Sequence, residues 1–135
     1  MTTYVQARED LVSAFHGPWT TAWPGVQMFY ENTTQIDLDT VGPVFVTAAI
    51  DFTDGVRMEF DADPATRTWG EVTFRVFAKE GVGTKTALLI FDFLTALMKY
   101  RTFGGVTTDC PAPGPKQGSK GWVSFGLTVP FFFYQ

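Results

Sequence analysis

The chain has 135 residues, of which 45% are apolar and only 18% are charged, and this balance excludes a disordered tail. The net charge of −4 lacks the basic footprint of a protein that grips nucleic acid through its phosphates. With Cys110 as its single cysteine, the chain cannot form an internal disulfide. Aromatic residues reach 16%, which is high for one small core, so we expect part of this ring surface to lie at interfaces.

A periodic pattern at the N-terminus predicts an amphipathic helix over residues 3–15, because apolar side chains recur there every three or four positions. Thr2 or Thr3 is placed to cap its first turn. The pair Gly17-Pro18 predicts the end of this helix, since proline cannot continue the hydrogen-bond ladder.

Residues 19–25 predict an irregular crossing segment that carries two indole side chains, Trp19 and Trp23. A first short strand is predicted over residues 26–30. Residues 31–43 are rich in Asn, Thr, Asp, Gly and Pro, which predicts a loop.

Alternation of apolar and polar residues predicts three consecutive antiparallel strands, over residues 44–52, 56–60 and 67–79. The first two are predicted to form a tight hairpin at Asp54-Gly55, because Asp-Gly is a strong hairpin-turn signal. A second turn-rich segment separates the second strand from the third.

The last third of the chain predicts a helix over residues 84–101 whose polar stripe is narrow, so most of its circumference must be covered. A short strand is predicted over 106–110, and the Pro- and Gly-rich residues 111–121 predict a flexible surface loop. The last strand, over 122–133, contains Pro130, which cannot donate to a ladder. This strand is therefore predicted to lie at an edge or to bulge.

The order helix, strands, helix, strands predicts one α+β domain over residues 1–135, in which a mainly antiparallel β-sheet packs on one face against two α-helices. No secretory signal is expected, since the N-terminus has no basic segment followed by an apolar run. The longest apolar stretch, residues 87–98, is shorter than the ~20 residues that a bilayer-spanning helix needs.

Side chains suited to catalysis or metal binding are scarce. His16 is the only histidine and falls at a predicted helix end, so a nucleophile would have no obvious general base. The acidic pairs Asp37 and Asp39, and Asp61 and Asp63, could offer oxygen ligands, but neither has calcium-loop spacing and both are better interpreted as solvated loops. We therefore expect no enzyme activity, no catalytic residue, no cofactor and no bound metal.

Several short motifs occur in a characteristic order along the chain. They are Trp23-Pro24, Tyr30-Glu31-Asn32, Gly81-Val82-Gly83 before the long helix, Pro111-Ala112-Pro113-Gly114 and Gly121-Trp122-Val123-Ser124-Phe125. This order and spacing resembles the tail terminator (tail completion) proteins of long-tailed bacteriophages, in a branch recorded as a phage-related domain of unknown function. The resemblance covers nearly the whole chain and depends on the order of the motifs, because each one is short.

The resemblance implies a structural subunit of the virion that forms a hexameric ring, caps the tail tube, stops its polymerisation and joins it to the head connector. The implied partners are further copies of the chain, the tail-tube protein and the head-completion protein. Genome DNA would pass through the channel without specific binding, and no membrane is involved. The implied place is the head-proximal end of the tail, after assembly in the bacterial cytoplasm. Another head-tail connector, neck or tail-tube subunit is an alternative, and a small α+β binding module is a further one.

Charged residues are distributed unevenly, which the resemblance does not explain. Among the charged residues, those in 31–63 are mostly acidic and those in 99–120 are mostly basic. We hypothesise that acidic hairpins of one subunit meet a basic loop of its neighbour, or line the channel, with solvated loop surface as the alternative. The candidate residues are Asp37, Asp39, Asp61 and Asp63 on the acidic side and Lys116 and Lys120 on the basic side.

Aromatic side chains supply the second interface hypothesis. Trp19, Trp23 and the tail 131–134, which includes Phe132 and Tyr134, hold more ring surface than one small core is expected to bury. We predict that these rings are buried between subunits, and packing within the domain is the alternative.

Overall fold

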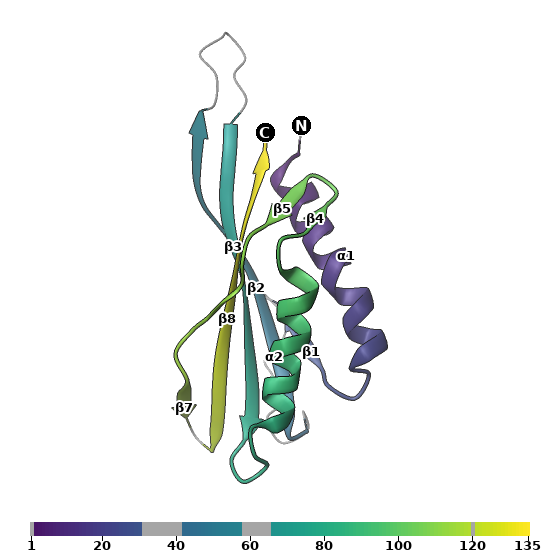
Figure 1. The fold of residues 1–135 in the computed structure, drawn as a ribbon, viewed down its shortest axis with the longest axis vertical. Helices are drawn as coiled ribbons and strands as arrows, with labels where there is room; N and C mark the ends of the chain where they lie inside the picture. Colours follow the sequence, from purple (N-terminus) through teal and green to yellow (C-terminus); the bar gives the residue numbers. More distant parts are fainter. Residues whose placement is uncertain (1, 31–41, 58–65, 120) are drawn as a thin grey trace.

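The computed structural model describes residues 2–30, 42–57, 66–119 and 121–135, which form two helices and an eight-stranded sheet. The strands are β1 (Met28–Tyr30), β2 (Val44–Arg57), β3 (Thr66–Lys79), β4 (Thr102–Phe103), β5 (Val106–Thr108), β6 (Ala112–Pro113), β7 (Gln117–Ser119) and β8 (Trp122–Tyr134). The helices, α1 (Tyr4–Ala22) and α2 (Lys85–Met98), lie along the same side of the sheet (Figure 1). The predicted α+β class, a mainly antiparallel sheet with helices on one face, is confirmed.

Helix α1 begins at the predicted place. Thr3 caps it in a capping box: the Gln6 N–H donates to the Thr3 hydroxyl at 3.1 Å, and the Thr3 N–H donates to the Gln6 side-chain oxygen at 2.9 Å. These two bonds satisfy backbone donors that a helix start leaves without intrahelical partners.

The predicted end of α1 at Gly17-Pro18 is wrong, because Pro18 lies inside the helix and the helix continues to Ala22. Its buried side chains recur every fourth residue, at Ala7, Leu11, Phe15 and Trp19. Burying Trp19 in the same stripe requires one more helical turn, and burying an apolar side chain of this size contributes roughly as much as Pro18 costs. The segment predicted as an irregular crossing over 19–25 is therefore helical in its first half.

The predicted hairpin at Asp54-Gly55 is also wrong. Strand β2 runs without a turn through these residues and pairs with β3 along its whole length, from Val44↔Ala78 to Arg57↔Thr66. The register shifts between Phe52 and Asp54, so the segment forms a β-bulge instead of a turn. The connection from β2 to β3 falls at 58–65, outside the described residues.

Strand β8 lies inside the sheet, so its predicted edge position is wrong. It pairs with β3 on one side and with β5, β6 and β7 on the other. The Pro130 carbonyl accepts from the Asp109 N–H at 2.8 Å, so the backbone of Pro130 faces the side where β5 has ended and β6 has not begun. The missing N–H of proline therefore falls at a gap in the ladder.

The segment 111–121, predicted as a flexible loop, supplies β6 and β7 and lies along β8. Helix α2 ends at Met98, three residues earlier than predicted, and Tyr100 then takes a φ of 48°. The chain returns as β4 and β5, and the sheet order is β1-β2-β3-β8-β5-β4, with β1 parallel to β2.

The core lies between the helices and one face of the sheet. In β3 the alternation predicted from the sequence is confirmed, because Val72, Phe74 and Val76 are fully buried. They pack with Leu11 and Phe15 of α1 and with buried side chains of α2 in one cluster. Neither described helix combines the length and the apolar character needed to cross a membrane.

Candidate protein-protein interface

The face of the sheet opposite the helices, here called the outer face, is the candidate functional surface. Successive side chains of a strand point to opposite faces, so the residues between the core positions of β2, β3 and β8 lie on it. Neither described helix packs against this face (Figure 1). Its central residues, row by row across these strands, are Asp51, Glu71 and Pro130, then Ala49, Thr73 and Thr128, then Thr47, Arg75 and Gly126.

Aromatic side chains gather around Arg67 at one end of the outer face, and we call this group the Arg67 cluster. The guanidinium carbon of Arg67 lies 4.0 Å from the ring centroid of Phe132, 5.1 Å from that of Trp69 and 6.0 Å from that of Tyr134. The Arg67 Nε is buried and has no hydrogen-bond partner among the described residues, while Tyr134 remains 44% exposed. Arg, Trp and Tyr are the residues most enriched at energetically dominant interface positions.

Cation–π stacking should also stabilise the subunit itself. Replacing Arg67 with alanine is expected to lower the free energy of unfolding by about 1 kcal/mol, the usual value for a partly exposed cation over aromatic rings. Lysine at this position should not restore it, because an ammonium lacks the planar surface that stacks on Phe132 and Trp69. Urea denaturation of both variants measures the effect, and a lysine variant as stable as the wild type would contradict it.

A second aromatic cluster closes the other end of the outer face. Phe45 and Phe77 stack with centroids 4.6 Å apart, and Trp122 meets Phe45 edge-on at 5.1 Å. Phe45 is only 2% exposed and Trp122 only 8%, so these rings are already covered within the chain. This second cluster therefore offers much less surface to a partner than the Arg67 cluster does.

Helix α2 presents the second open surface. Leu88 and Leu89 are 50% and 49% exposed, and they lie between the exposed Lys85 and Asp92 on the side of α2 that faces away from the core. The sequence predicted that most of this helix would be covered. Within the described chain, part of its apolar surface remains open.

The tryptophans predicted for an interface lie between the two helices. Trp19 is 2% exposed and its indole N–H donates to the Val26 carbonyl at 3.0 Å, so it belongs to the core of the subunit. Trp23 is partly buried and stacks on Trp19 with centroids 6.0 Å apart. Phe93 of α2 meets both rings. Packing within the domain therefore accounts for this pair.

The remaining candidate residues do not form one site in the described chain. Phe132 and Tyr134 come together in the Arg67 cluster, whereas Lys116 is exposed elsewhere, with its Nζ 5.8 Å from the Phe125 ring. Asp37, Asp39, Asp61, Asp63 and Lys120 lie outside the described residues. Arg67 and Trp69 were not selected from the sequence. The sequence did contain the signal that could have found them. Both residues are an odd number of positions from Val72 and Phe74 along one strand, so their side chains had to lie on the opposite face.

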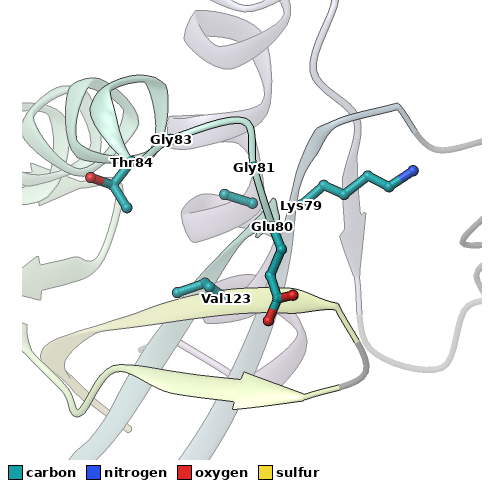
Figure 2. Close-up of a pocket in the computed structure, with 7 residues that line it drawn as sticks. Lys79, Glu80, Gly81, Gly83, Thr84 and Val123 are labelled. Carbon is teal, nitrogen blue, oxygen red and sulfur yellow. The ribbon is translucent and has the colours of Figure 1, made fainter.

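A shallow pocket of about 140 Å³ lies where β3 turns into α2. Among the described residues that line it, Lys79 and Glu80 carry charge, and their side chains extend in different directions (Figure 2). Small-molecule sites usually measure about 300–1,000 Å³ and contain convergent polar groups. This geometry supports a strand-to-helix turn and offers no basis for a substrate site.

Titratable groups elsewhere in the described residues are dispersed. No three His, Cys, Asp or Glu side chains gather there in an arrangement able to hold a metal ion. The imidazole Nδ1 of His16 lies 2.5 Å from the Tyr30 hydroxyl, and burial raises the pKa of Tyr30 above its ordinary value. This contact ties α1 to β1 on the surface.

Comparison with known proteins bears on the fold alone. No family model and no curated protein matches the chain, whereas 21 chains among the solved structures do. One of them superposes with a TM-score of 0.72 at 14% sequence identity, covering 93% of this chain and 92% of that one. A likeness at this identity shows that the α+β architecture recurs over a full chain of similar length, and it assigns no activity.

Proposed function

We propose that the chain is a structural subunit of a bacteriophage tail terminator, which forms a ring that caps the tail tube and joins it to the head connector. The observation that supports this most is the outer face of the sheet, which neither described helix covers and which carries the partly exposed Arg67 cluster at its end. Partly exposed aromatic and arginine side chains on a sheet face that lacks a covering helix among the described residues are typical of a surface that binds protein. The choice of family depends on the order of the sequence motifs, which resembles that of tail terminator proteins.

The same proposal extends to the binding partners of the subunit and to its location in the phage particle. The subunit would contact further copies of itself, the tube protein below the ring and the head-completion protein above it, at the head-proximal end of the tail. The chain's net charge of −4 suits a channel through which DNA slides, because like charge removes the attraction of phosphates to the wall. A small-molecule binding module is less well supported, since the pocket near α2 is small.

Electron microscopy of the purified protein, combined with light scattering, tests this proposal. We expect closed rings of one diameter and one mass, because a terminator must stop after one layer. Open filaments would instead indicate a tube subunit, and a monomer at every concentration would favour a binding module.

A second expected result concerns phage particles. Phages that lack the gene should assemble tails longer than those of the wild type, since nothing would stop tube growth, and supplying the gene in trans should restore the length. Tails of normal length in its absence would contradict the terminator function and point to a connector.

A further inference from the structure

We propose that the ring is held by a head-to-tail contact in which the exposed side of α2 of one copy docks on the outer face of the sheet of the next copy. This inference deepens the proposed ring function and depends on it. The occupant of the open sheet is thus a second copy of this chain, and the contact is repeated around the ring.

The two surfaces lie on opposite sides of the molecule. Helix α2 buries Ala87, Ile90, Leu94 and Met98 against one face of the sheet, so Leu88 and Leu89 point away from it. The outer face points in the other direction (Figure 1). A contact between two different surfaces of identical chains is heterologous, and such contacts generate rings when the rotation closes.

On α2, the exposed residues change along the helix axis from basic to apolar to acidic. Lys85 comes first, Leu88 and Leu89 lie in the middle, and Asp92 follows. With a rise of 1.5 Å per residue, Lys85 and Asp92 are separated by about 10 Å along the helix.

On the sheet, the same order of character occurs with opposite charges. Glu71 is exposed, Thr73 comes next with small neighbours on both adjacent strands, and Arg75 follows. With about 3.4 Å per residue, Glu71 and Arg75 are separated by about 14 Å along β3. These two spacings agree within the reach of the long side chains involved.

An α2 that runs in the same direction as β3 of its neighbour would therefore match this face at three points. Lys85 would meet Glu71, the two leucines would lie on the row of Ala49, Thr73 and Thr128, and Asp92 would meet Arg75. This row consists of small, partly exposed side chains, which allow a helix to approach closely.

The acidic end of this surface lacks compensation within its own row. Asp51 and Glu71 are both exposed and lie directly opposite each other in the β2–β3 register. Like charges in this position destabilise a sheet, and their third neighbour on β8 is the uncharged Pro130. A lysine from the next copy would offset this repulsion on assembly.

At the basic end of this surface, Arg75 is oriented by hydrogen bonds to groups that carry no charge. Arg75 donates to the Ser124 hydroxyl at 3.1 Å and to the Gln117 side-chain oxygen at 3.4 Å, and both acceptors are uncharged. The guanidinium is thus oriented in advance for a carboxylate such as Asp92 of the neighbour, which reduces the ordering that binding would require.

A charge exchange tests the contact. Lys85→Glu and Glu71→Lys should each weaken ring assembly about tenfold in the subunit dissociation constant, because each places like charges together. The double variant should assemble nearly as well as the wild type, since every copy carries both changes. Lys99→Glu, one residue beyond the end of α2, and Glu9→Lys, on α1, are exposed charge reversals outside the contact and serve as controls.

A crosslink supplies an independent readout. In a Cys110→Ser background, Leu88→Cys together with Thr73→Cys should give a ladder of disulfide-linked species up to the closed ring, whereas either cysteine alone should give no species larger than a dimer. Intact rings in every charge variant, with no ladder, would overturn this contact and leave the ring function standing. A wild-type protein that never forms rings would overturn both.

Discussion

Replacing Phe131 or Phe133 with alanine is expected to lower the free energy of unfolding by about 3–5 kcal/mol. Phe131 is 1% exposed and Phe133 is fully buried, and the two rings stack 6.4 Å apart beneath Phe52 and Tyr4. Each change would leave a cavity that the surrounding strands cannot close. Because a domain of this size is stable by only about 5–15 kcal/mol, either variant should unfold at much lower urea concentration.

The residues between them give the matched control. Phe132 and Tyr134 lie on the outer face, so Phe132→Ala or Tyr134→Ala should cost no more than about 2 kcal/mol of folding stability. Both should nevertheless weaken assembly, since they remove rings of the Arg67 cluster from the outer face. Urea titration followed by tryptophan fluorescence measures the loss of folding stability. Light scattering measures the loss of assembly. Equal losses of stability at all four positions would contradict this division of the tail.

This alternation changes how the C-terminal tail can be tested. Cutting the chain after Pro130 would remove Phe131 and Phe133 from the core together with the exposed rings. Unfolding of such a fragment would therefore say nothing about an interface. In the sequence, residues 131–134 form one continuous aromatic segment. In strand β8 their side chains alternate between the core and the outer face.

Much of the fold could be predicted because its signals are local. The period-two pattern around Val72 and Phe74 determines which face of β3 is buried, and Thr3 with Gln6 forms a capping box within four residues. Such signals depend on neighbours that are close in the sequence. They also sufficed for the α+β class, because the order of elements limits the ways in which they can pack.

Three of the wrong predictions share one cause, which is that a distant partner overrode a local signal. Pro18 predicts a helix end, but Trp19 is buried one residue later only if the helix continues. Asp54-Gly55 predicts a turn, but β3 continues to pair with β2 past this point. Pro130 predicts an edge, but the neighbouring strands leave a gap where its N–H would have been.

The candidate interface was predictable only in part, for a related reason. Alternation places Phe132 and Tyr134 on one face, but their contact with Arg67 depends on the β3–β8 register, in which Arg67 lies opposite Tyr134 and Trp69 opposite Phe132. Register is set by the whole ladder and not by either strand alone. The sequence did predict that both helices pack on one face of the sheet, and the structure confirms this arrangement, which leaves the opposite face without a described helix (Figure 1).

Gly70→Ala is expected to destabilise the protein by about 3 kcal/mol, near the upper end for overpacked sites. A Cβ at this position would lie closer than 3.0 Å to the backbone oxygen of Asp51 and to the ring of Phe131. Gly70 pairs with Phe52 immediately before the β-bulge, so here β2 approaches β3 too closely for any side chain. Relief would require the bulge to open or Phe131 to leave the core.

The matched control is Gly17→Ala on α1, where a Cβ would meet nothing within 4 Å. Alanine is the better helix former by about 1 kcal/mol, so this variant should be more stable than the wild type. Thermal and urea unfolding of the two variants measure the contrast. If Gly70→Ala were as stable as the wild type, the close approach of β2 to β3 beside the bulge would be wrong.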